Sequence, residues 1–336
     1  MIVFLYNGCF FMYQVKNFIM WAKASMKYII RKARTVLSIT FMCSSAMAMN
    51  HLDSANRAVF YKTIDSFSAT AASNADKIDA LSAILLGAEY LGGSVGEGDQ
   101  GKYDKDPLNR FDVFDCTTYV ETILAGAISS TSEEFQSNLH RIRYRGAKVD
   151  FVSRNHFPSV DWIRNNQDKL MDITPDVGGG KARVAKAMID KSAWYQALTG
   201  DVLKCDPESS SQCLNLLKQL HEEGRIYPAE PAYIPYVPLT ALFGGNTNKV
   251  DQTLLNRIPS GSVISMVRPN WDIKKYIGTN MNVSHQGLAI RKNGTLFLRH
   301  ASLTNKKVMD ENFAEYFSKY SETSSLKGFN VQVLRR

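Results

Sequence analysis

Acidic residues are missing from the start of the chain, where none of the first 52 positions is Asp or Glu. Positions 1–48 carry six basic side chains, namely Lys16, Lys23, Lys27, Arg31, Lys32 and Arg34. The 336-residue chain has 40 basic and 32 acidic residues and a formal charge of +8. Subtracting the six leaves 34 basic against 32 acidic residues, a charge of +2. The chain beyond residue 48 therefore offers no charge argument for nucleic acid as a partner.

The basic start also lacks an apolar run of the ~20 residues that a membrane-spanning helix needs. From Met26 it instead reads as a basic segment, a short apolar core over 36–43, and the small residues Ala46 and Ala48. This order predicts a secretory signal peptide cleaved after Ala48, with 1–25 as an upstream extension and Met26 as the start. We expect an exported protein, periplasmic or secreted, without stable membrane insertion after cleavage. An uncleaved membrane anchor is the alternative.

Cysteine is scarce, with five in the whole chain, which excludes a small disulfide-rich scaffold. Removal of the leader removes Cys9 and Cys43. In the oxidising compartment implied by export, Cys205 and Cys213 are natural disulfide partners because they flank a short polar loop. Cys116 is then left over, either as a buried thiol or as a reactive one.

Internal repeats and long low-complexity linkers are also absent from the sequence. Helical periodicity runs through 54–91, a glycine-rich stretch follows over 92–101, and a second helix is predicted from Asp115. The section 131–258 is mixed, and the last part of the chain has the short apolar runs of strands at 263–267, 283–290 and 295–299. Helices followed by strands predict an α+β fold.

Two motifs in the glycine-rich region do not indicate ligand sites. Gly96–Gly101 fits G-x-G-x-x-G, but no predicted strand precedes it and no helix follows, which argues against dinucleotide binding. The nearby carboxylates do not have the spacing of a calcium loop. We expect them to lie in a solvated loop; they are Asp99, Asp104, Asp106 and Asp112.

Cys116 has a sequence context that suits a nucleophile. It lies in the first turn of the predicted helix, where Asp115 can cap the backbone and Thr118 with Glu121 offers a second capping pair. Unpaired N–H groups and the helix dipole at this end favour a thiolate. The same N–H groups are suited to an oxyanion.

Two histidines are brought together by a predicted hairpin. Asn293-Gly294 is a strong signal for a two-residue turn, and paired positions then sum to 587. His300 falls opposite Gly287, so His285 and His300 become diagonal neighbours on one face, within ~7–8 Å. A nucleophilic cysteine needs a base and a third group that orients the base. Cys116, His285 and His300 can fill these roles; the alternative is two unrelated histidines on a half-buried strand.

These segments together resemble a known family. The Cys116 helix, the Ser-His-Gln-Gly strand and the Arg-His-Ala strand are similar to the papain-like NlpC-type cell-wall hydrolases, and most to their N-acetylmuramoyl-L-alanine amidase-like branch. The resemblance covers about 78–335. It implies a papain-like fold in which the cysteine helix packs on an antiparallel sheet, one domain over 49–336, and a large insertion at about 131–258.

The resemblance also implies site residues and a reaction. Cys116 corresponds to the nucleophile, His285 to the base and His300 to the group that orients it. Candidate substrate-binding residues are Arg154, Asn155, His156, Asp161 and Trp162, with Tyr103 as the counterpart of a family tyrosine. The implied function is hydrolysis of an amide bond in peptidoglycan or a muropeptide, without a metal or organic cofactor. A non-catalytic wall- or partner-binding module and a thioester-using acyltransferase are the alternatives.

Overall fold

The computed structural model describes residues 51–208, 210–244 and 249–335. The predicted extension and signal peptide at 1–48 lie outside these ranges. A helix over 51–66 precedes the named helices. These are α2 (Asn74–Ile84), α3 (Cys116–Ile128), α4 (Phe135–Arg143), α5 (Ile163–Asn165), α6 (Thr174–Gly178), α7 (Lys191–Ala197), α8 (Ser211–Gly224), α9 (Leu239–Phe243), α10 (Gln252–Asn256), α11 (Lys274–Ile277) and α12 (Phe313–Ser318). None of the described helices combines the length and apolarity needed to cross a membrane.

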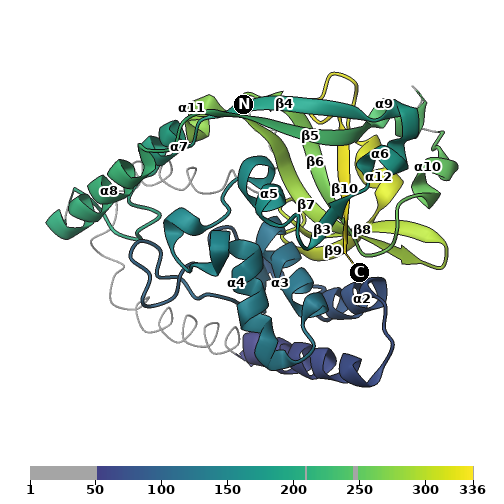
Figure 1. Ribbon diagram of the computed structural model, residues 1–336, viewed down its shortest axis with the longest axis horizontal. Helices are drawn as coiled ribbons and strands as arrows, with labels where there is room; N and C mark the ends of the chain where they lie inside the picture. Colours follow the sequence, from purple (N-terminus) through teal and green to yellow (C-terminus); the bar gives the residue numbers. More distant parts are fainter. Residues whose placement is uncertain (1–50, 209, 245–248, 336) are drawn as a thin grey trace, which may run out of the picture.

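One curled, ten-stranded sheet organises the molecule (Figure 1). Its strands are β1 (Glu89–Tyr90), β2 (Val113–Phe114), β3 (Leu170–Asp172), β4 (Arg183–Ile189), β5 (Glu230–Pro238), β6 (Ser262–Trp271), β7 (Met281–Lys292), β8 (Thr295–Ser302), β9 (Lys307–Asn312) and β10 (Gly328–Leu334). The order is β2-β1-β9-β8-β7-β6-β10-β5-β4, with β3 paired to β10. All pairs are antiparallel except β1 with β2. The mixed α+β class is confirmed.

The central strands are covered on both faces. On one face α2 and α3 pack through Leu81, Val120 and Leu124 against Leu288 and Ile290 of β7. The other face carries a second apolar cluster, in which Phe313 and Phe317 of α12 join Met266, Leu298 and Phe329. Successive residues of β7 therefore point alternately toward α3 and toward α12.

The predicted hairpin is confirmed in its turn and in its register. Asn293 and Gly294 both have positive φ, at 49° and 82°, as a type I′ turn requires. Leu288 pairs with Arg299 and Ala289 with Leu298, which is the register that sums to 587. The three predicted strands near the C-terminus are β6, β7 and β8.

The helical periodicity predicted over 54–91 belongs to two helices, because the chain breaks between the helix ending at 66 and α2, and the end of the segment forms β1 instead. Ser73 and Asp76 form a capping box that starts α2 as a separate helix. The run from Pro228 to Pro238 also contains a strand, β5. Over 230–236 this strand pairs with β4 alone. Among the described residues no strand lies on its other side there to accept a hydrogen bond, so prolines, which lack an N–H, are tolerated.

Candidate functional site

The Cys116 segment folds as predicted. Cys116 is the first residue of α3, and Asp115 is the N-cap. The Asp115 carboxylate accepts from the Thr118 N–H at 2.8 Å, and the Thr118 hydroxyl lies 3.0 Å from the Asp115 N–H. This reciprocal pair, rather than Thr118 with Glu121, forms the capping box. Burial raises the pKa of Asp115, and the hydrogen bonds from Thr118 oppose this.

Cys116 is almost completely buried, with 1% of its surface exposed. Its sulfur lies 3.8 Å from the Thr117 hydroxyl. Cys116 is disulfide-bonded in the structure, so the expectation that it is left over as a thiol is wrong here, and nucleophilic chemistry refers to its reduced form. The predicted disulfide between Cys205 and Cys213 is confirmed.

The segment after Cys116 is in contact with the segment of His285. The Thr117 hydroxyl donates to the Gln286 side chain at 3.2 Å, and Gln286 in turn donates to Ser265 of β6 at 3.2 Å. Gln286 therefore points toward α3. This polar contact fixes the start of α3 over β7, one residue along the chain from Cys116 and from His285.

His285 and His300 meet as the hairpin register predicts. Nε2 of His285 lies 2.6 Å from Nδ1 of His300, and both rings are buried. Gly287 permits this approach, since a Cβ there would lie 2.9 Å from the His300 Cβ and 2.9 Å from Leu298. Burial and the neighbouring His300 lower the pKa of His285 well below its usual value, with Arg268 adding to the effect.

The histidine pair lies on the face of the sheet covered by α12. His285 pairs with Met266, which belongs to the α12 cluster, and the His300 ring lies 5.4 Å from the ring of Tyr316. Ser284 forms a β-bulge beside His285 on β7, where the register with β6 shifts. Both histidines line a cavity of about 100 Å³, together with Glu311, Tyr316 and Tyr320.

Glu311 belongs to this site and was missed by sequence reasoning. Its Oε2 accepts a hydrogen bond from Nε2 of His300 at 2.9 Å, and its Oε1 from Lys319 at 2.6 Å. The hydrogen bond from His300 is the largest of the effects that lower the pKa of Glu311 to about 2. A signal was present in the sequence: Thr304-Asn305-Lys306 reads as a turn after β8, and extending the pairing past it places Glu311 on the His300 face.

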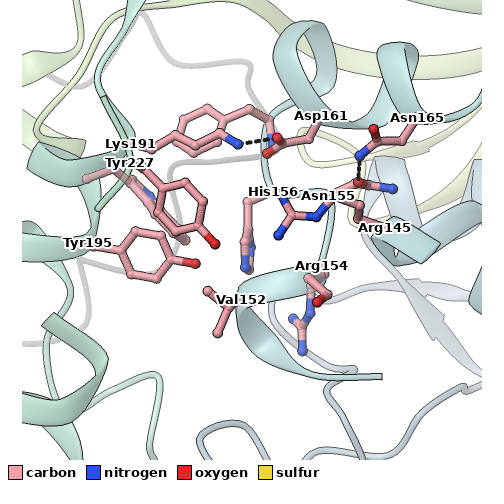
Figure 2. Close-up of a pocket in the computed structure, with 13 residues that line it drawn as sticks. Arg145, Val152, Arg154, Asn155, His156, Asp161, Asn165, Lys191, Tyr195 and Tyr227 are labelled. Carbon is pink, nitrogen blue, oxygen red and sulfur yellow. Dashed lines mark hydrogen bonds and ion pairs between the residues drawn. The ribbon is translucent and has the colours of Figure 1, made fainter. Parts of the chain in front are cut away.

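Arg154, Asn155, His156 and Asp161 lie close together around a narrow crevice of about 10 Å³ (Figure 2). Asn155 and Asp161 mainly brace the backbone and neighbouring side chains. The Asn155 amide donates to Ile142 O at 2.9 Å, and Asp161 accepts from Lys191 and from the Phe157 N–H.

Arg154 and His156 also line the larger cavity described below. Arg154 forms ion pairs with Glu97 and with Asp104, the latter at 3.1 Å. His156 lies against Phe151 and Trp194, at ring distances of 4.5 and 4.7 Å, and its Nε2 is 2.7 Å from Phe151 O. Burial and Arg154 lower the pKa of His156 well below its usual value.

The expectation that the carboxylates of the glycine-rich region are solvated is wrong for three of them. Asp104, Asp106 and Asp112 are buried, because each has a cation or backbone partner: Arg154 for Asp104, Lys204 for Asp106, and Arg110 for Asp112. Among the described residues no cluster of His, Cys, Asp or Glu is arranged to hold a metal ion.

Trp162 and Tyr103 line neither the narrow crevice nor the larger cavity that the other predicted binding residues line. Trp162 is fully buried and donates from its indole to Glu121 at 3.1 Å, so it offers no surface to a ligand. The Tyr103 hydroxyl donates to Glu223 of α8 at 2.8 Å, and its ring lines a different cavity near the disulfide. Sequence adjacency to true pocket residues does not fix the direction of these side chains.

A cavity of about 210 Å³ opens beside the start of α3. Its polar side includes Asp115, Thr117, Glu121, Arg143 and Arg154. Its apolar side comes from α7, α11 and the preceding loops, with Val95, Phe151, Trp194, Leu198, Tyr276 and Ile277. A chain with both hydrogen-bonding groups and small apolar groups, such as a peptide, suits such a lining.

Comparisons with known proteins agree with this architecture. The model of the N-acetylmuramoyl-L-alanine amidase-like family matches residues 80–323. A crystal structure from Legionella pneumophila strain Philadelphia 1, assigned to the family DUF1460, is 36% identical and has a TM-score of 0.79, covering 86% of this chain and 97% of that one. An N-acetylmuramoyl-L-alanine amidase from Bacteroides uniformis is 22% identical with a TM-score of 0.55, covering 78% and 99%, which shows a shared fold. No curated protein matches the chain.

Proposed function

Because the chain belongs to the N-acetylmuramoyl-L-alanine amidase-like family, we propose that it is an exported cysteine hydrolase of peptidoglycan amide bonds. In this proposal the fold is of the papain-like NlpC type. The carrying observation is the meeting of two segments: Thr117, next to Cys116, bonds to Gln286, next to His285, while His285 bonds to His300 at 2.6 Å.

The proposed reaction uses the reduced form of Cys116. Its thiolate attacks the carbonyl carbon of the scissile amide. The proposal requires that the thiol proton passes to His285, whose ring faces α12 and not α3 in this structure. N–H groups at the start of α3 are available to the developing oxyanion. His285 then donates the proton to the leaving nitrogen as the C–N bond breaks and a thioester forms.

Hydrolysis of the thioester completes the cycle. His285 takes a proton from water, the resulting hydroxide attacks the thioester carbonyl, and the C–S bond breaks to return the thiolate. The cavity of about 210 Å³ beside Asp115 and Thr117 is the proposed place for the substrate chain, and Arg154 and His156 are its proposed binding residues.

Product analysis tests this function. Purified protein is reduced, incubated with peptidoglycan or muropeptides, and the products are identified by mass spectrometry. We expect cleavage at an amide bond, either between muramic acid and L-alanine or within the stem peptide. Cys116→Ala abolishes cleavage, whereas Cys213→Ala, a cysteine change far from α3, retains it after the same reduction. Full activity of Cys116→Ala contradicts the mechanism, and an inactive reduced wild-type protein favours a binding module.

A further inference from the structure

Two polar side chains, Glu311 and Lys319, continue the histidine pair beyond His300. Nε2 of His285 meets Nδ1 of His300 at 2.6 Å, and Nε2 of His300 meets the Glu311 carboxylate at 2.9 Å. The other carboxylate oxygen receives the Lys319 ammonium at 2.6 Å. The side chains of His300 and Glu311 are 3% and 13% exposed, so this chain of contacts is largely shielded from water.

We infer that Glu311 is a positioning residue that fixes the tautomers of His300 and His285 and thereby leaves Nδ1 of His285 as the proton acceptor. The inference rests on the proposed function only in assigning the base role to His285. It adds a residue beyond the Cys116, His285 and His300 set.

With both rings neutral, the tautomers follow from the donors and acceptors around them. An ionised carboxylate only accepts, so Nε2 of His300 must carry a proton. Nδ1 of neutral His300 then has no proton and accepts, which requires the proton of His285 to be on Nε2. Nδ1 of His285 is left with the lone pair that takes the thiol proton. The carboxylate is ionised at neutral pH, because the hydrogen bond from His300 and the contact with Lys319 lower the pKa of Glu311 to about 2.

Because of Lys319, the effect of Glu311→Gln on the tautomers of His300 and His285 can be predicted. An ammonium has only donors, so in Glu311→Gln the amide oxygen faces Lys319 and the amide NH₂ faces His300. Nε2 of His300 then has to accept, its proton moves to Nδ1, and Nδ1 donates to Nε2 of His285. His285 becomes protonated at Nδ1, which is the wrong tautomer for a base.

Nitrogen-15 NMR of histidine-labelled protein measures the tautomers directly. The chain has six histidines, so few signals need assignment, and His285→Gln and His300→Gln identify the two of interest. In the Cys116→Ala background we expect both rings protonated at Nε2. Glu311→Gln is expected to move both protons to Nδ1. Glu315→Gln on α12, which removes an exposed carboxylate nearby, leaves the spectrum unchanged.

Kinetics supply the second readout. Since a wrong-tautomer substitution in a related catalytic arrangement costs ~10⁴-fold in turnover, Glu311→Gln is expected to lower turnover by roughly 10²–10⁴-fold. In the double variant with Lys319→Met, the amide oxygen of Gln at position 311 is free to face His300. Turnover of this double variant is expected to be at least tenfold higher than that of Glu311→Gln alone.

The outcomes separate this inference from the proposed function. Both rings keeping the Nε2 proton in Glu311→Gln, or turnover within threefold of wild type, overturns the positioning role. Lack of rescue by Lys319→Met overturns the part assigned to Lys319. If the reduced wild-type protein cleaves no peptidoglycan, the proposed function fails, while the tautomer measurement still decides whether Glu311 controls the two rings.

Discussion

Arg143→Met is expected to destabilise the protein strongly, because it leaves a buried carboxylate without its cation. Arg143 of α4 donates to Glu121 of α3 at 2.6 Å, and both side chains are 3% exposed. Arg143 also donates to Leu108 O at 2.5 Å. Without Arg143, Glu121 retains the hydrogen bond from the Trp162 indole. Breaking a buried pair from one side costs ~3–5 kcal/mol.

The loss is expected to grow with pH. Burial is the largest influence on the pKa of Glu121 and raises it, whereas Arg143 opposes this. Without Arg143 the folded-state pKa rises further above the unfolded value of ~4.3. The folded state then binds a proton more tightly, so stability falls as pH rises from the unfolded pKa through the folded one. Asp115 responds in the same direction, because Arg143 also lowers its pKa.

Thermal unfolding at pH 5 and pH 8 measures both effects. At pH 8 the midpoint of thermal unfolding should fall by roughly 5–9 °C, since an unfolding entropy of ~2.1 cal/mol/K per residue gives ~1.7 °C per kcal/mol for a chain of this size. At pH 5 the drop should be smaller. Adding Glu121→Gln removes the buried charge and keeps an acceptor for Trp162, so it should recover part of the stability and reduce the pH dependence to the share that comes from Asp115.

Arg225→Met is the matched control, since the Arg225–Glu222 pair is 60% and 63% exposed. Such a surface pair contributes ~0–1 kcal/mol. If Arg143→Met costs no more than this control, or costs the same at both pH values, the reasoning about the buried pair is refuted.

Two further predictions concern backbone approach and covalent linkage. Gly287→Ala places a Cβ 2.9 Å from the His300 Cβ and from Leu298, so we expect a loss of ~1–3 kcal/mol in urea unfolding together with reduced hydrolysis. Gly92→Ala enters open space and should change neither; equal behaviour of the two variants would remove the steric argument. Replacing Cys205 and Cys213 together by Ser is expected to cost ~2–3 kcal/mol under non-reducing conditions, and unchanged thermal unfolding would show that the bond does not stabilise the fold.

Local chemistry in the sequence determined several parts of the site. Asp115 before Cys116 predicted where α3 begins, because a short acidic side chain can satisfy the N–H groups at a helix start. Asn293-Gly294 predicted the turn of the hairpin, because both residues tolerate positive φ. The turn then fixed the register, and the register alone brought His285 and His300 together.

Other features were decided by tertiary packing. Nothing adjacent in sequence says that Asp104 is neutralised by Arg154, fifty residues later, or that Trp162 is buried against Glu121 rather than presented to a ligand. Strand β5 could not be predicted because it contains prolines. A strand tolerates a proline only where the missing N–H has no neighbouring strand to pair with, and that depends on the tertiary structure.

The sequence by itself determined the elements that carry Cys116, His285 and His300, since helix caps and tight turns are set by residues a few positions apart. Only the tertiary structure decided which face of the sheet the histidines occupy, that Glu311 and Lys319 complete their hydrogen-bond chain, and which charged groups surround the cavity beside α3. The physical reason is that burial and charge pairing depend on side chains distant in sequence, and these meet only after the sheet has closed around its two apolar clusters.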